Sequence, residues 1–125
     1  MKLEGLINSR EIDKNISNFS RKYILAKPFP HIVIDNFLNP DCLENTLKGF
    51  KKVDWAKYTH FNENKSGNKT KTFDPSLQST INALNSREFL LLLEKITGIS
   101  TLIPDHELGS GGVHRSSRGG FLNIH

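Results

Sequence analysis

Apolar residues between positions 43 and 50 recur every three or four residues, which is the spacing of one face of a helix. The pattern follows Asn39-Pro40, which fits an N-cap and a first helical residue that needs no N–H. It predicts a helix over residues 40–50 with one buried apolar stripe. The stripe consists of Leu43, Leu47 and Phe50.

A second helical pattern starts after Asp74-Pro75, where the cap and proline signal is repeated. Asn85-Ser86 interrupts it, and Ser86 is expected to cap a further helix that ends at Gly98. Supporting helices are therefore predicted within 75–97, and a core role is favoured over a cofactor site. Their apolar residues are Leu77, Ile81, Leu84, Phe89, Leu90, Leu92, Leu93 and Ile96.

β-Branched and aromatic residues predict strands over 31–38 and 53–61, the first of them after the helix-stopping pair Pro28 and Pro30. Residues 62–72 are polar and are expected to form a loop. Beyond residue 108, glycine pairs flank short apolar runs, a pattern that indicates strands and tight turns.

The chain of 125 residues fits one domain. Residues 1–27 show helix-like spacing at Ile12, Ile16 and Phe19 but no strong cap, so they are expected to be a loosely helical lead-in. The main domain is expected to cover 28–125.

Composition indicates a globular protein that does not span a membrane. The longest apolar run, Phe89 to Leu93, is far shorter than the roughly 18 residues of a membrane span. The N-terminus has no apolar core typical of a secretory signal. A single cysteine, Cys42, excludes an internal disulfide and fits a reducing compartment, so a cytoplasmic location is expected.

Basic residues exceed acidic ones by 17 to 13, which gives a net charge of +4. The densest basic run, Lys65 to Lys71, lies in a Gly-, Asn- and Thr-rich stretch. A solvated loop is favoured there, and no nucleic-acid partner is expected. A small basic nucleic-acid-binding protein remains a rival, with steep salt dependence as its signature.

The histidines show no tight metal-ligand spacing. A surface or hydrogen-bonded role is favoured over metal binding for His31, His60 and His106. His114 and His125 fall on neighbouring predicted strands and could converge, although the residues alone favour ordinary strand histidines. In the last strand, alternation places His125 on one face with Phe121 and Asn123.

Other reactive residues give weaker signals. Cys42 falls in the first turn of a predicted helix, and a structural role is favoured over nucleophilic catalysis. Gly109 to Gly112 lacks the Lys-Ser/Thr pair of a phosphate-binding loop. The residues by themselves therefore name no catalytic group and leave any cofactor-binding residues unknown.

Several segments of the chain resemble those of a known protein family. Pro28 to Leu38 resembles the opening strand of bacterial prolyl-hydroxylase-like dioxygenases that depend on Fe(II) and 2-oxoglutarate, and Asn39 to Phe50 resembles the helix after it. The stretch from Ser86 is similar to the family's approach to its His-x-Asp motif. Gly119 lies six residues before His125, and Leu122, in place of the commoner tyrosine, lies three before. The similar segments are 86–98, 102–105, 111–114 and 118–125.

The resemblance implies that His125 is an iron ligand of a facial triad with two histidines and one carboxylate. It implies an α+β fold containing the N-terminal, incomplete part of a double-stranded β-helix, or jelly roll. The implied reaction hydroxylates a C–H bond of a small-molecule or peptidyl substrate while 2-oxoglutarate and O2 yield succinate. Ascorbate is a common reductant of this branch, and the oligomeric state is left open.

On this resemblance the carboxylate, the distal histidine and the basic residue that holds 2-oxoglutarate are expected beyond residue 125. The chain is then a fragment that ends at its first ligand, His125. The fragment alone is expected to be marginally folded and inactive. The main alternative is a non-catalytic jelly-roll binding module without a metal.

Overall fold

The computed structural model describes residues 3–109 and 111–124, which form both helices and strands. The helices are η1 (Leu3–Gly5), α1 (Ser9–Lys14), α2 (Ile16–Leu25), α3 (Pro40–Phe50), α4 (Pro75–Leu84) and α5 (Arg87–Thr97). The strands are β1 (Trp55–His60), β2 (Glu63–Asn68), β3 (His114–Arg115) and β4 (Phe121–Leu122). Helices combined with an antiparallel sheet confirm the α+β class.

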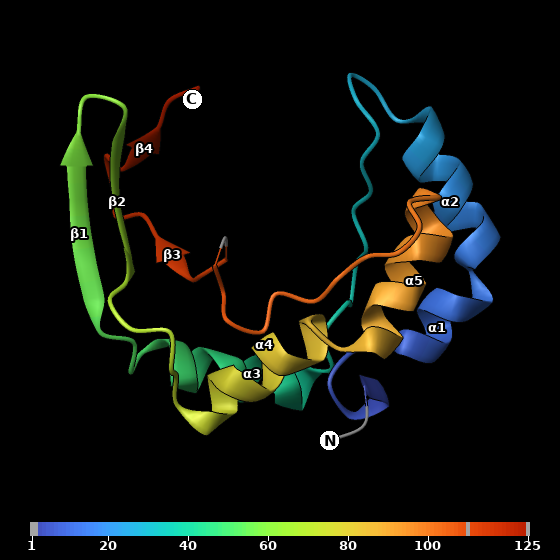
Figure 1. The fold of residues 1–125 in the computed structure, drawn as a ribbon, viewed down its shortest axis with the longest axis horizontal. Coiled ribbons are helices and arrows are strands. Elements are labelled where there is room, and N and C mark those ends of the chain that lie inside the picture. Colours follow the sequence, from blue (N-terminus) through green and yellow to red (C-terminus); the bar gives the residue numbers. More distant parts are fainter. Residues whose placement is uncertain (1–2, 110, 125) are drawn as a thin grey trace.

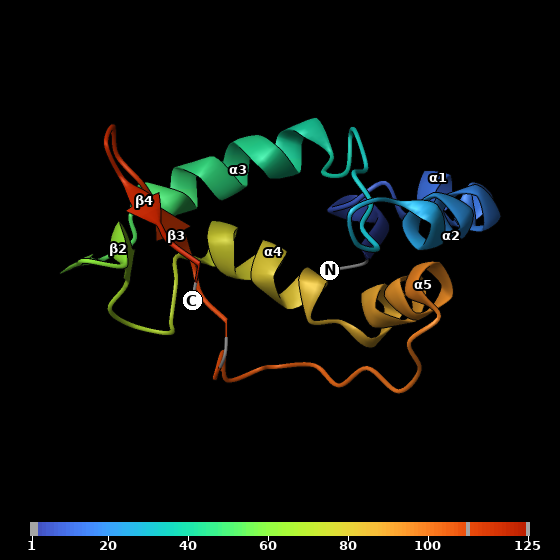
Figure 2. The same cartoon turned by 90° about the horizontal axis from the view of Figure 1, so that it is seen from above.

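The sheet lies at one end of the molecule and α1, α2 and α5 lie at the other, with α3 and α4 between them (Figures 1 and 2). α2 packs on α5, and α3 packs on α4. The chain after α5 runs back past α4 to the sheet, so that β3 and β4 join strands formed much earlier in the sequence (Figure 1).

The predicted helix over 40–50 is confirmed as α3, but the predicted buried stripe is wrong. Leu43 and Leu47 are 46% and 52% exposed, whereas Cys42 and Gly49 are buried. Small residues face α4 because they let two helix backbones approach closely. The larger leucines consequently lie on the side away from this contact.

Gly49 shows how close the approach is. A methyl group at this position would lie 2.7 Å from the backbone nitrogen of Leu77 and 2.6 Å from Oγ of Ser76. Nearby, the hydroxyls of Thr46 and Thr80 are 2.6 Å apart, and Sγ of Cys42 lies 3.5 Å from Oγ1 of Thr80. The contact between α3 and α4 is therefore partly polar.

The predicted caps of α4 and α5 are confirmed. The Asp74 carboxylate accepts a hydrogen bond from the backbone N–H of Ser76, and the Ser86 hydroxyl accepts one from Phe89. Gly98 ends α5 with φ 75°, the left-handed conformation that favours glycine. Leu84, expected in the buried stripe, is 36% exposed at the last turn of α4.

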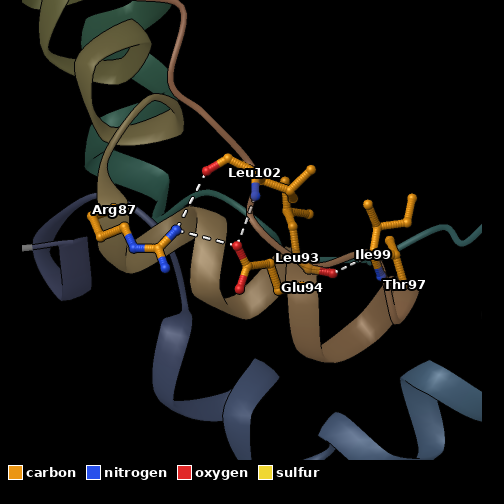
Figure 3. A network of polar contacts seen from close by, with 6 residues as sticks. All are labelled: Arg87, Leu93, Glu94, Thr97, Ile99 and Leu102. Carbon is orange, nitrogen blue, oxygen red and sulfur yellow. Dashed lines mark hydrogen bonds and ion pairs between the residues drawn. The ribbon is translucent and has the colours of Figure 1, made fainter.

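A polar network fixes the chain that leaves α5 (Figure 3). The Glu94 carboxylate accepts hydrogen bonds from the backbone N–H of Leu102 at 2.8 Å and from Arg87 at 3.2 Å. The Leu102 hydrogen bond, followed by that of Arg87, holds the pKa of Glu94 below its usual value against the opposing effect of burial. Arg87 also donates to the Leu102 carbonyl, so both the N–H and the C=O of Leu102 are hydrogen-bonded.

The hydrophobic core includes the N-terminal residues that were expected to form a lead-in. Ile7 is fully buried and pairs with Leu38 through an isolated β-bridge. The backbone N–H groups of Asn8 and Asn39 complete the connection by donating to Phe37 and Leu6. The core cluster of buried residues is Leu3, Leu6, Ile7, Cys42, Ala83 and Leu92.

β3 and β4 behave as two parts of one interrupted strand. Both pair antiparallel with β2, β3 opposite Ser66 and Gly67 and β4 opposite Glu63 and Asn64. The residues between them bulge away from the ladder. On one face, Arg115 lies 4.5 Å from the centroid of the Trp55 ring, and that ring packs on Phe50 of α3.

Two strand and loop predictions are corrected. Residues 31–38 do not form a strand, although Ile32 and Ile34 are less exposed than Val33. Their only bridge in the described part of the chain is Leu38 with Ile7, and a turn with φ 53° at Asn36 ends the extended run. An extended segment without a partner strand has no ladder of hydrogen bonds.

Residues 62–72, expected to be a loop, contain β2. Asn, Lys, Ser and Gly have low strand propensity, but β1 pairs with β2 on one side and β3 and β4 on the other. Position in the middle of the sheet thus overrides local preference. The predicted strand over 53–61 is confirmed as β1 with shorter bounds.

Within the described residues, no helix is long and apolar enough to cross a membrane.

Candidate functional site

One face of the sheet gathers polar and aromatic side chains from three strands. Glu63, Lys65 and Gly67 alternate along β2 and therefore share a face. Tyr58 of β1 is the partner of Lys65, and His114 of β3 is the partner of Gly67, so both belong to the same face. Cross-strand pairing thus brings together residues that are up to 56 positions apart.

These residues line a hollow of about 270 Å³ together with Lys71 and the loop residues Leu108, Gly109 and Gly111. Gly67 lies in it between two rings. A methyl group at Gly67 would lie 3.1 Å from Cε2 of Tyr58 and 3.9 Å from Cε1 of His114. The absence of a side chain at Gly67 therefore lets the two rings approach the strand.

The loop wall is held by hydrogen bonds to Asp105. Its carboxylate accepts from the backbone N–H of Gly109 at 2.9 Å, and its carbonyl accepts from Leu108. Its own N–H donates to the Asn85 side chain at the end of α4. Leu108 is buried with φ 50°, a conformation that is unfavourable for leucine and has to be maintained by these contacts.

Asn68 connects the hollow's strand to both neighbouring segments. Its side-chain carbonyl accepts from the backbone N–H of Val113, and its backbone N–H donates to the Val113 carbonyl. Its side-chain amide donates to the carbonyl of Thr70. Asn68 thus fixes where the chain leading to Lys71 leaves β2, and also where β3 begins.

The charges around the hollow favour an anion. Lys65 and Glu63 form an ion pair at 3.1 Å, with side chains only 18% and 22% exposed. Their charges largely offset each other. Lys71 has no ion pair within residues 3–109 and 111–124, so its positive charge is not compensated by a described carboxylate.

The structure divides the basic run that was expected to be a solvated loop. Lys65 lies within β2 and is mostly buried, Lys69 lies 3.4 Å from Asp54, and Lys71 borders the hollow. Lys65 is held in the paired strand β2, whereas Lys69 and Lys71 follow the end of that strand. The run is therefore not one continuous solvated segment.

The histidines considered from sequence do not meet in the described part of the chain. His31 lies in the unpaired extended segment with Nδ1 2.8 Å from the Phe29 carbonyl oxygen. His60 ends β1, and His106 occupies an exposed turn. Among them and His114, only His114 lines the hollow. Cys42 is buried against Thr80, as a structural role requires.

His125, the predicted iron ligand, lies outside the described residues. His114 lies in β3, and the described part of the segment that leads to His125 forms β4, which follows β3 along β2. By register, His114 shares a face with Leu122, and Phe121 lies on the opposite face. Residues 3–109 and 111–124 contain no group of three or more His, Cys, Asp or Glu side chains that could hold a metal ion.

Sequence reasoning missed the main residues of the hollow. Tyr58 was assigned only to the predicted strand over 53–61, and Glu63, Lys65 and Lys71 were assigned to a loop. The available signal was the alternation of Glu63, Lys65 and Gly67 at period two, directly after a predicted strand.

Comparison with protein-family models, with curated proteins and with solved structures found no match to this chain. The hollow and its chemistry therefore have to be judged from the residues themselves.

Proposed function

We propose that this chain forms the first part of a dioxygenase domain that depends on Fe(II) and 2-oxoglutarate and resembles prolyl hydroxylases. The observation that carries the proposal is the run from Gly111 to His114 and from Arg118 to His125, which resembles the family's approach to its His-x-Asp motif. Strands β3 and β4 lie within this run. Each pairs antiparallel with β2, which is compatible with the early strands of a jelly roll.

The proposal assigns His125 to iron and assigns the carboxylate, the second histidine and a basic residue for 2-oxoglutarate to sequence that follows it. The described residues alone do not fit an iron site, because they contain no three-ligand group. As an overall reaction, the complete enzyme would convert 2-oxoglutarate and O2 to succinate and CO2 while hydroxylating a small-molecule or peptidyl substrate.

The first experiment is to determine the coding sequence after the codon for His125. An Asp two positions later, with a second histidine and an Arg or Lys further on, supports the proposal. A continuation without these residues contradicts it and favours the second candidate, a binding module without a metal. The hollow beside Gly67 favours that second candidate specifically, because none of the residues that line it is assigned to iron.

The second experiment measures succinate release from 2-oxoglutarate by the protein with its continuation. His125→Ala should abolish release, since the facial triad needs both histidines. His106→Ala is the matched control, because the His106 side chain is exposed in a turn and is not assigned to the metal or among the residues that line the hollow, and it should retain activity. Equal activity of the two variants would remove His125 from the iron site.

A further inference from the structure

We propose that the hollow beside Gly67 binds a small carboxylic acid, with the carboxylate at Lys71 and the hydrocarbon part beside the rings of Tyr58 and His114. The site does not depend on the proposed iron chemistry, because none of these residues is assigned to the metal. The residues that form it belong to the part of the chain that the structure describes, and they come from both neighbours of β2.

The negative charge of the ligand follows from the charges that surround it. Lys65 is already paired with Glu63 at 3.1 Å, and Lys71 is the remaining cation of the hollow. The Asp105 carboxylate of the loop wall accepts a hydrogen bond from the backbone N–H of Gly109. A ligand carboxylate would therefore supply the counter-ion that Lys71 lacks among the described residues.

The apolar part of the ligand follows from the floor of the hollow. Gly67 presents only backbone there, and carbon atoms of the Tyr58 and His114 rings flank it. Leu108 adds an aliphatic side chain from the loop. These carbon atoms offer contact to a short hydrocarbon chain, and the polar side chains of Lys65, Asn68 and Lys71 line the rest of the hollow.

The size of the hollow limits the ligand to a small molecule. At about 270 Å³ it is at the lower end of the range of roughly 300–1,000 Å³ that small-molecule sites occupy. The residues that line it come from the sheet and from the loop at Leu108 and Gly109, and its volume suits a small ligand rather than an extended peptide.

The test uses butyrate as the probe and follows backbone amide chemical shifts of the protein with its continuation by NMR in the presence of EDTA. Butyrate should produce saturable shifts at Gly67, Gly109 and His114. Butyramide, which has the same hydrocarbon chain without the charge, should produce none at equal concentration. Equal shifts from both compounds would overturn the proposal.

Two lysine variants separate a built site from general attraction. Lys71→Gln should weaken butyrate binding roughly tenfold, the usual range for losing one charge-assisted hydrogen bond. Lys69→Gln removes the same charge two residues away, where Lys69 pairs with Asp54 outside the hollow, and it should leave binding unchanged. An unchanged affinity in Lys71→Gln, or an equal loss in both variants, contradicts the assignment.

Inorganic phosphate decides between a carboxylate site and a general anion site. Butyrate should bind more tightly than phosphate, because only butyrate contacts the floor. Phosphate binding with no butyrate binding would overturn the choice of ligand. EDTA keeps these outcomes separate from the dioxygenase proposal, since loss of iron leaves the predicted butyrate shifts in place.

Discussion

Asp74 links two parts of the chain at the N-terminus of α4. Its carboxylate accepts hydrogen bonds from Nζ of Lys52 and Oγ of Ser76, both at 2.6 Å, and from the backbone N–H of Ser76. The Lys52 interaction, followed by the two from Ser76, lowers the pKa of Asp74 from 3.8 to about 2. The ionised form is therefore favoured in the folded state.

The sign of this shift gives a pH prediction. Because the folded pKa of Asp74 is depressed, its stabilisation is present above pH 3.8 and is lost as pH falls toward about 2. Asp74→Asn should lower the free energy of unfolding at neutral pH, and its difference from the wild type should shrink across that interval. Urea unfolding at several pH values measures this. Asp35→Asn, at an exposed position, is the control and should change the free energy of unfolding little at neutral pH.

A second prediction at the residue scale concerns the backbone conformation of Gly98. Its φ of 75° is strained for any residue with a side chain, and no atom would contact an added methyl group. Gly98→Ala should therefore lower the free energy of unfolding by about 1 kcal/mol through backbone strain alone. Gly5→Ala, where space is also open and φ is not positive, should have little effect in the same urea titration. Equal losses would refute the strain explanation.

At the scale of elements, the contact between α3 and α4 depends on small residues. Alanine at Gly49 would gain about 1 kcal/mol in helix propensity but would overlap Ser76 and Leu77 across the contact. Overpacking of this kind costs about 1–3 kcal/mol, so Gly49→Ala should give a net loss of up to about 2 kcal/mol. Thermal and urea unfolding measure the loss.

A substitution on the exposed face of α3 serves as the comparison for Gly49→Ala. Leu47, predicted from sequence to be buried, is 52% exposed. Leu47→Ala should cost less than about 1 kcal/mol, because only part of its surface is removed from water. A larger loss from Leu47→Ala than from Gly49→Ala would mean that the sequence-based stripe, not the small-residue face, packs on α4.

At the scale of the whole molecule, residues near the N-terminus connect the helical layers. Ile7 is fully buried, and its bridge to Leu38 joins the first residues to the segment before α3. Ile7→Ala should lower the free energy of unfolding by about 2–5 kcal/mol, the range for truncating a buried isoleucine. Ile24→Ala, at a position 60% exposed, is the control and should change it little. Denaturant unfolding compares the two.

The hollow is also a product of the whole molecule. Tyr58 and Lys65 come from a local hairpin, but His114 and the loop at Leu108 reach it only after the chain has passed through α4 and α5. The anchoring of Leu102 by Glu94 and of Asp105 by Asn85 directs that return path. Binding at the hollow should therefore be sensitive to contacts far from it.

Local signals in the sequence determined α3, α4 and α5. Asn39-Pro40, Asp74-Pro75, Ser86 and Gly98 act through neighbouring backbone groups, so their effect does not depend on the rest of the fold. The strand β1 could also be predicted from the local sequence, because its aromatic and β-branched residues favour extended backbone.

Only the tertiary structure decided which residues face one another. Glu63 to Asn68 became a central strand, and residues 31–38 remained unpaired, because a strand exists only where a partner supplies hydrogen bonds. Likewise, the buried face of α3 was set by how closely Gly49 lets α4 approach, not by the periodicity of its leucines. The hollow beside Gly67 depends on the same long-range pairing, which is why no single segment of the sequence could indicate it.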